Sequence, residues 1–283
     1  MKKISILILS VAILFVSCQT FKKEPLPLGE QEITFSQTVG IINNAGNKAP
    51  AVLLLHGFAS SKDEVAGLYK RLSDELFKFG ISSLRIDFRA WGESSFPMEL
   101  SSADNMILDA EEALKWLGSR KDVGDIGIHG FSLGCGVAIE AAGNNSSKIK
   151  TMGLWSCINS FEEQLEELME IDSSAVNKTI TEGKAEFDLG WRKITLGKDF
   201  FDSMTKYDLQ KSYGKFKGNV LIIDGAEDTL VTSLKTYGDL APDRTTTFAI
   251  PGAGHIFAVF SDNPEPANQL LEKTVTWYKT NLL

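Results

Sequence analysis

The pattern of apolar and polar positions predicts strands that alternate with helices. Strands are predicted at residues 51–56, 82–88, 126–128, 149–155, 219–223 and 246–250, and the continuous apolar run of the first is typical of a strand buried on both faces of a sheet. Apolar residues at helical spacing mark residues 65–79, 103–116, 137–142 and 264–282. Short strands at residues 33–35 and 39–42 favour a hairpin before the first buried strand. This alternation predicts an α/β fold with a mostly parallel, doubly wound sheet.

The alternation is interrupted once, at about residues 156–213, where no buried strand is evident. An insertion of this length over the carboxyl edge of the sheet would form a cap. Its aromatic residues either line the underside of the cap or form a small core of its own: Phe187, Trp191, Phe200, Phe201 and Tyr207. Glutamates beside the apolar stripe that begins at Phe161 are interpreted as a solvated helix face.

The first residues predict a targeting segment. Lys2 and Lys3 precede an apolar run over residues 4–16, which is shorter than the roughly 20 residues of a membrane span and fits a signal peptide over residues 1–17. The sequence that ends at Cys18 resembles the lipobox of bacterial lipoproteins, although Phe15 stands where an aliphatic residue is usual. The resemblance implies lipidation of Cys18 and an exported, membrane-anchored protein; a secreted soluble protein is the alternative.

The overall composition limits the classes of domain organisation, binding partner and cofactor that are expected. Residues 18–32 are polar and include Pro25 and Pro27, so they predict a tether before one domain over residues 33–282. A formal net charge of −8 without a basic stripe argues against nucleic acid. Three cysteines cannot build a disulfide framework. No His-x-x-x-His or Cys-x-x-Cys spacing occurs in the sequence, and no metal or cofactor is expected.

The strongest chemical motif is Gly-Phe-Ser-Leu-Gly at residues 130–134, between a predicted strand and a predicted helix. This pattern is that of a nucleophile elbow, in which a sharp turn lifts the serine hydroxyl clear of the sheet. Side chains at Gly130 or Gly134 would collide where strand and helix approach. Ser132 is therefore the predicted nucleophile, and the alternative is a glycine-rich turn with an idle serine.

A serine nucleophile requires a base and an acid that orients the base. His255 is the only one of the three histidines that follows the acid candidates, and it lies in a glycine-rich loop after the last strand. Asp224 and Asp228 are the acids weighed after the strand at residues 219–223. Asp228 is preferred because it lies further into the loop, whereas Asp224 could simply cap a turn. The order Ser132, Asp228, His255 is that of an α/β-hydrolase triad.

Several motifs together resemble one family. The sequence shares Leu-His-Gly-Phe at residues 55–58, a pattern like that of residues 85–94, the elbow, and the Gly225–Val231 turn with α/β hydrolases of the serine-esterase, lipase and aminopeptidase branch. Over about residues 33–282 it is most similar to bacterial cinnamoyl (feruloyl) esterases, which carry a small cap in the same interval.

The resemblance implies an α/β-hydrolase fold and a serine ester hydrolase that forms an acyl-enzyme. It implies that the backbone N–H groups of Phe58 and Leu133 bind the oxyanion. The substrate expected is a small ester with a short acyl or hydroxycinnamoyl group. A peptidase or a lipase on the same scaffold, or an inactive surface binding lipoprotein, are the alternatives.

The pattern departs from the family at Ala90, Trp91, Phe131 and Cys135 without removing a catalytic group. The residues proposed to shape the substrate pocket are His56, Trp91, Phe131 and Trp191. Asp87 and Arg89 are interpreted as a structural pair behind the turn.

Overall fold

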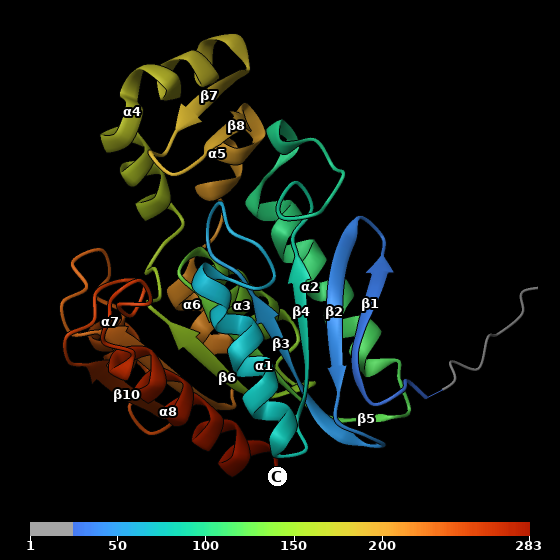
Figure 1. The fold of residues 1–283 in the computed structure, drawn as a ribbon. Helices are drawn as coiled ribbons and strands as arrows, with labels where there is room; N and C mark the ends of the chain where they lie inside the picture. Colours follow the sequence, from blue (N-terminus) through green and yellow to red (C-terminus); the bar gives the residue numbers. More distant parts are fainter. Residues whose placement is uncertain (1–24) are drawn as a thin grey trace, which may run out of the picture.

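The computed structural model describes residues 25–283, in which an eight-stranded sheet forms the centre of the molecule (Figure 1). The strand order is β1-β2-β4-β3-β5-β6-β9-β10; β1 and β2 are antiparallel to their neighbours, and the other strands are parallel. The strands span Gly29–Phe35 (β1), Thr38–Asn44 (β2), Ala49–Leu55 (β3), Ser82–Asp87 (β4), Val123–Phe131 (β5), Ile149–Trp155 (β6), Asn219–Gly225 (β9) and Thr245–Ile250 (β10). The predicted mostly parallel α/β sheet is confirmed.

Helices cover both faces of the sheet, as a doubly wound architecture requires. Helices α1 and α8 lie on one face, and α2, α3 and α6 lie on the other (Figure 1). Each face has its own buried apolar cluster, and the central strands contribute alternate residues to the two clusters. The helices span Leu68–Lys78 (α1), Ala103–Gly118 (α2), Leu133–Asn144 (α3), Leu209–Lys215 (α6), Ser233–Leu240 (α7) and Glu265–Leu282 (α8), and short 3₁₀ turns occupy Val65–Gly67 (η1) and Met98–Leu100 (η2).

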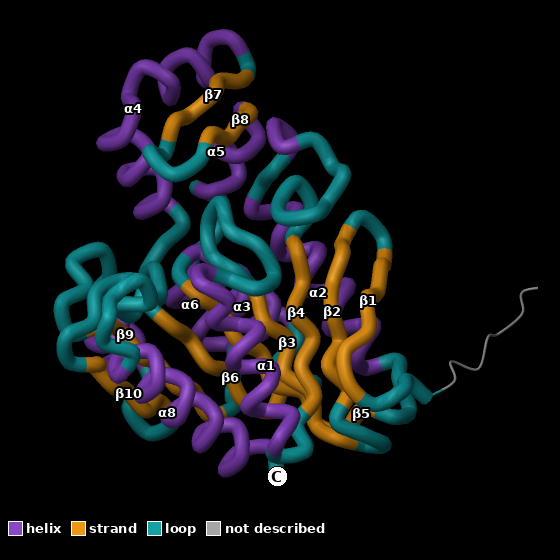
Figure 2. The backbone as a smooth tube through the Cα atoms, in the orientation of Figure 1, coloured by secondary structure: helices purple, strands orange, loops and turns teal. Residues whose placement is uncertain are grey.

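The interval expected to form a cap carries its own small sheet, which the sequence analysis missed. Strands β7 (Lys184–Asp188) and β8 (Lys193–Gly197) pair in an antiparallel hairpin between α4 (Glu162–Glu182) and α5 (Lys198–Met204). Only alternate residues of β7 are buried, so it lacks the apolar run that marks the central strands. These four elements lie beyond the carboxyl ends of the parallel strands (Figure 2), whereas α6 packs against α3 in the body. We call residues 157–207 the cap.

The aromatic residues of the cap mainly form its own core. Phe187, Phe200 and Phe201 are buried; Phe201 stacks on Phe187, with ring centroids 6.1 Å apart, and meets Phe200 edge to face at 5.7 Å. Phe200 also reaches the body, where its ring centroid lies 5.6 Å from that of Phe58. The second of the two alternatives therefore describes most of these residues.

The amino-terminal boundary differs from the prediction. Strand β1 begins at Gly29, so residues 29–32 belong to the sheet rather than to a tether. The Leu26 N–H donates to the Asp122 carboxylate at 2.9 Å, and Asn44 donates to the Leu26 carbonyl at 2.8 Å. The predicted signal peptide and Cys18 lie outside the described residues. Within residues 25–283, no helix combines the length and apolar character that a membrane crossing requires.

Candidate active site

Ser132 lies on a sharp turn between β5 and α3, as the motif predicted. Its backbone has φ 52° and ψ −121°, a conformation that residues with side chains rarely adopt. The Ser132 N–H donates to the Trp155 carbonyl, and its own carbonyl accepts from Cys135, both at 2.9 Å. These bonds fix the turn between the sheet and the first turn of α3.

The motif requires glycine at residues 130 and 134 because a side chain there would collide with neighbouring backbone atoms, not because the backbone angles demand it. A Cβ on Gly130 would lie 2.5 Å from the Gly134 carbonyl oxygen. A Cβ on Gly134 would lie 2.2 Å from the carbonyl oxygen of Leu55, at the end of neighbouring β3. The predicted collision is confirmed, and the structure adds that Gly134 allows the helix to approach the adjacent strand as well as its own.

Three side chains from distant loops meet at this turn. The Ser132 Oγ lies 3.0 Å from His255 Nε2, and His255 Nδ1 lies 2.9 Å from Asp228 Oδ2. The Asp228 side chain is 1% exposed and that of His255 is 21% exposed. Burial alone would raise the pKa of Asp228, but its hydrogen bond to His255 and the charge of that ring hold the pKa below its usual value. Asp228 is thus an ionised acceptor that fixes the His255 ring.

Asp224, the other acid considered, has a different role. Its side chain is buried, and its carboxylate accepts from the Ser233 hydroxyl at 2.7 Å and from the Leu234 N–H at 3.3 Å. Asp224 therefore links β9 to the start of α7. Burial raises the pKa of Asp224 to about 6. Its carboxylate is committed to α7, which leaves Asp228 as the partner of His255.

Ser156 was not predicted to belong to the site. It directly follows β6, has φ 44°, and its hydroxyl donates to the His255 carbonyl at 2.9 Å. The same hydroxyl helps to lower the pKa of Asp228. Ser156 therefore positions the loop of the base, and nothing in its sequence context distinguishes it from any serine after a strand.

The two backbone donors expected for an oxyanion flank Ser132. Leu133 N–H is the first of α3, and Phe58 N–H lies in the loop after β3, whose Gly57 is in van der Waals reach of Ser132. Within the described residues, neither N–H has a hydrogen-bond partner in the protein. Both remain available to a negatively charged oxygen above Ser132.

A buried glutamate holds the loop that carries Phe58, and the sequence analysis missed it. Glu64 is 7% exposed, and its carboxylate accepts from the Gly57 N–H at 2.7 Å and from its neighbour Val65 at 3.2 Å. It also accepts from the Ser60 hydroxyl. Burial raises the pKa of Glu64 to about 7, although these hydrogen bonds and the nearby His255 oppose the rise. We call residues 57–64 the oxyanion loop.

Two of the four proposed pocket residues are corrected by the structure. His56 is 1% exposed, accepts from the Phe88 N–H through Nε2 and lies 2.7 Å from the Gly57 carbonyl through Nδ1. Burial lowers the pKa of His56 to about 4, so it is a neutral link between strand ends. Trp91 is also 1% exposed and donates to Ser101, so it supports Phe58 from behind.

The other two pocket residues lie at the periphery of the triad. The Phe131 ring centroid is 5.4 Å from that of His255, and Phe131 is 4% exposed, so it supports the base. Trp191 lies at the tip of the β7–β8 hairpin and is 67% exposed. It therefore belongs to the rim of the cap rather than to a closed pocket.

The expected pairing of Asp87 with Arg89 is wrong, although both residues are structural. Asp87 binds the Lys62 ammonium at 2.9 Å, and the Lys62 N–H at 2.6 Å, in a buried ion pair. Arg89 instead forms a bidentate pair with Asp109 of α2. The chain reverses sharply after β4, so the side chains of residues 87 and 89 point to different partners.

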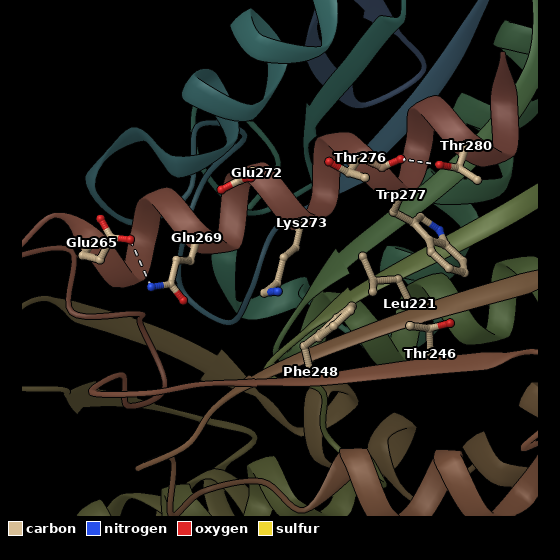
Figure 3. Close-up of a pocket in the computed structure, with 10 residues that line it drawn as sticks. All are labelled: Leu221, Thr246, Phe248, Glu265, Gln269, Glu272, Lys273, Thr276, Trp277 and Thr280. Carbon is tan, nitrogen blue, oxygen red and sulfur yellow. Dashed lines mark hydrogen bonds between the residues drawn. The ribbon is translucent and has the colours of Figure 1, made fainter.

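A separate groove of about 540 Å³ lies between α8 and the edge strand β10 (Figure 3). Phe248, Lys273 and Trp277 line it, and no triad residue does. Its lining holds no nucleophile next to a base, so it does not compete with the Ser132 site. Among residues 25–283, no group of three or more His, Cys, Asp or Glu side chains is arranged to hold a metal ion.

Comparison with known proteins agrees with this architecture. Residues 50–168 match a family model described as the α/β hydrolase fold. The ferulic acid complex of Est1E from Butyrivibrio proteoclasticus superposes with a TM-score of 0.73 at 18% identity, over 89% of this chain and 98% of that one. An esterase of Pyrococcus furiosus gives a TM-score of 0.65 at 20% identity, over 91% of this chain and 92% of that one. The chain is therefore an α/β hydrolase by fold.

Curated relatives point to esterases and lipases of that fold. The esterase EstD of Thermotoga maritima is 34% identical over 125 residues, which is 42% of this chain and 30% of the relative. The lysophosphatidylserine lipase ABHD12 of Gallus gallus is 35% identical over 95 residues, which is 33% of this chain and 23% of the relative. The matches span less than a third of these relatives. They confirm the predicted resemblance to esterases of the α/β-hydrolase fold.

Proposed function

We propose that the protein is a serine ester hydrolase that uses Ser132, His255 and Asp228 as its catalytic triad. The observation that supports this most directly is the continuous contact from Ser132 Oγ through the His255 ring to Asp228, at 3.0 and 2.9 Å. Such a chain of contacts at an elbow serine fits nucleophilic attack assisted by a general base.

In this mechanism, Ser132 Oγ attacks the ester carbonyl carbon while His255 Nε2 takes its proton. Asp228 fixes the ring so that Nδ1 carries its hydrogen and stabilises the imidazolium that forms. The N–H groups of Phe58 and Leu133 donate to the oxyanion. His255 then protonates the leaving alcohol, and a water molecule, activated by the same ring, releases the acid from the acyl-enzyme.

The test compares wild type with Ser132→Ala. We expect the variant to remain folded and to lose roughly four to six orders of magnitude in kcat, because the nucleophile is gone while the rest of the site is intact. Short and long acyl nitrophenyl esters, methyl hydroxycinnamates and an aminoacyl anilide form the substrate panel. Full activity of the variant would refute the triad. A wild type inert on the whole panel would favour a binding protein, and turnover of the anilide alone would favour a peptidase.

We propose short acyl or hydroxycinnamoyl esters as substrates. The Phe58 ring, which contacts Phe200 of the cap and Trp91 behind it, offers an apolar surface beside the oxyanion donors. The structurally similar Est1E holds ferulic acid. Each methylene in an apolar site contributes only about 1–3 kcal/mol, so we expect a graded fall of kcat/KM with acyl length. A rise toward long acyl chains without turnover of methyl hydroxycinnamates would indicate a lipase.

We propose further that Cys18 anchors the exported protein to a membrane. The support is the short apolar run that ends at Ser17 and Cys18. Several acyl chains, each contributing about 0.8 kcal/mol per buried CH₂, would hold the protein stably. Cell fractionation of wild type and Cys18→Ala tests this. We expect Cys18→Ala to appear in the soluble fraction and the wild type in the membrane fraction. Equal amounts of both proteins in the soluble fraction would indicate secretion without an anchor.

A further inference from the structure

The tip of the cap hairpin places a cation beside the oxyanion loop. Arg192, between β7 and β8, donates through Nη1 to the carbonyl of Ala59 at 2.5 Å. Ala59 directly follows Phe58, whose N–H is the proposed oxyanion donor. The guanidinium carbon lies 6.0 Å from the centroid of the Trp91 ring and 5.9 Å from that of Trp191. The charge is therefore held between two indoles at the edge of the proposed ester site.

Arg192 differs from the other cations of the cap in its partners. Each cap lysine that follows has a carboxylate within 4 Å: Lys178, Lys184, Lys193, Lys198 and Lys206. Across residues 25–283, no carboxylate lies within that distance of Arg192. A guanidinium has five N–H donors, and a single carbonyl partner leaves most of them for a ligand. Arg192 is thus the one cation of the cap that has no carboxylate partner within the described residues, and it is also the one that contacts the oxyanion loop.

We propose that Arg192 forms an anion subsite that binds a carboxylate or phosphate group on the ester substrate. This inference rests on the proposed esterase function and names its substrate class more narrowly: an ester that carries a second, negatively charged group. The planar guanidinium matches such oxygens in a bidentate geometry, and the indoles limit its hydration. The positive charge also reaches the oxyanion loop: burial is the main cause of the lowered pKa of His56, and the charges of Lys62 and, to a smaller extent, Arg192 lower it further.

The simpler role for Arg192 is structural: its hydrogen bond to Ala59 fixes the hairpin against the oxyanion loop. The two roles predict different substrate dependence. Loss of a structural contact changes the site for every substrate and reduces turnover of charged and neutral esters alike. An anion subsite affects only the charged ester, and the effect weakens at high salt because the charges are screened.

The experiment measures kcat/KM for two matched pairs of esters. The acyl pair is the mono-4-nitrophenyl ester of adipic acid and the same compound with its free carboxyl capped as a methyl ester, followed by nitrophenol release. The alcohol pair is 4-acetoxybenzoate and 4-acetoxybenzamide. In wild type we expect the charged member of one pair to be favoured, and that pair identifies the side of the ester that faces Arg192. In Arg192→Gln this preference should fall roughly 10- to 100-fold, as for the loss of a charge-assisted hydrogen bond. Arg192→Lys should restore part of it.

Lys193→Gln is the matched control, because Lys193 lies on the same hairpin but pairs with Glu186 at 2.8 Å. Its charged-to-neutral ratio should equal that of wild type. An equal loss for both members of each pair in Arg192→Gln, or the same shift in Lys193→Gln, would overturn the subsite. A wild type inactive on neutral and charged esters alike would refute the esterase function itself, so the two failures are distinguishable. Thermal unfolding of each variant verifies its fold.

Discussion

The oxyanion loop, residues 57–64, and the acid loop, residues 225–232, both border Ser132, but they are held in different ways. The oxyanion loop is fixed by charges: Lys62 pairs with Asp87, and Glu64 accepts from the Gly57 N–H. The acid loop is largely exposed and is fixed by its backbone, since Ala226 N–H donates to the Ile250 carbonyl at 2.9 Å and Glu227 N–H to the Ala253 carbonyl at 2.8 Å.

This difference fits the roles proposed for the two loops. An N–H that binds an oxyanion is most effective when it is held in place before charge develops, which agrees with a rigid loop around Phe58. The bonds to residues 250 and 253 couple the acid loop to the loop that carries His255. Substitutions of the buried charges Lys62 and Glu64 should therefore act strongly on the oxyanion loop, whereas in the acid loop only Asp228 should matter for turnover.

The largest effect is expected for Asp228→Asn, which should reduce kcat by roughly 10³- to 10⁴-fold, because an amide can no longer fix and stabilise the protonated His255 ring. Asp224→Asn, four residues earlier, should leave kcat close to wild type and lower the free energy of unfolding by about 1–3 kcal/mol through its bonds to Ser233 and Leu234. Steady-state kinetics and urea unfolding separate the two. The opposite ranking would assign the acid to Asp224.

Lys62→Met should produce the next largest change, in stability rather than chemistry. The Asp87 side chain is fully buried, and loss of the Lys62 ammonium leaves its charge uncompensated, at a cost of about 3–5 kcal/mol in the free energy of unfolding. Lys235→Met, which removes a fully exposed surface pair with Asp239 on α7, is the control and should leave the free energy of unfolding close to that of wild type. Equal costs in urea unfolding would contradict the distinction between buried and exposed charges.

At pH 8, where the Glu64 carboxylate is ionised, Glu64→Gln should lower kcat about 10-fold with a smaller change in KM, because the loss of a charge-assisted bond to the Gly57 N–H loosens the Phe58 donor. Glu227→Gln is the control on the acid loop, where the residue is exposed, and it should behave like wild type. A purely structural Glu64 would lower stability without this selective loss of kcat.

The raised pKa of Glu64 also predicts that the free energy of unfolding depends on pH, and that Glu64→Gln weakens this dependence. Burial raises this pKa from 4.5 to about 7, so the folded protein binds the proton more tightly than the unfolded chain between these values. The stabilisation is complete below pH 4.5 and is lost as the pH rises through 7, which amounts to roughly 2–3 kcal/mol between pH 5 and 8. Urea unfolding at both values should show this decline in wild type and a weaker one in Glu64→Gln. Parallel pH dependences would show that Glu64 does not titrate in this range.

The smallest effect is expected for Asp63→Asn. Its carboxylate pairs with Arg85 at 2.6 Å but is 44% exposed, and Glu30 also binds the same guanidinium. We expect a cost of under about 1 kcal/mol in urea unfolding and nearly unchanged turnover. A cost as large as that of Lys62→Met would show that the whole oxyanion loop is held cooperatively.

The sequence predicted the body of this molecule far better than its cap. Buried strands such as β6 were predicted at their observed bounds, because both faces are covered and most residues are apolar; Lys150 is the one exposed residue of β6. Strand β7 was not predicted, because only Ala185 and Phe187 face the core of the cap and the strand has no continuous apolar run. Helix α7 begins at Ser233, where the buried Asp224 carboxylate accepts from the Ser233 hydroxyl.

The triad contacts could be predicted because their motifs carry the chemistry at fixed chain positions. Glu64 and Arg192 could not, because their roles depend on tertiary contacts that have no period and no motif. Glu64 is a charged residue in a loop, and such residues are usually exposed. Trp91 and His56 were assigned to the pocket by their closeness in sequence to the motifs, but each side chain turns into the interior.

The position of the cap in the strand order has a consequence for how such enzymes diversify. The cap is inserted between β6 and β9, which pair directly with each other, from Thr151 with Asn219 to Trp155 with Ile223. Helix α6 remains in the body and supplies the crossover that two parallel strands require. Exchange of the cap, residues 157–207, between homologues would therefore leave the strand register beneath it unaltered. The incoming cap would also have to supply the contacts that Phe200 and Arg192 make with the oxyanion loop.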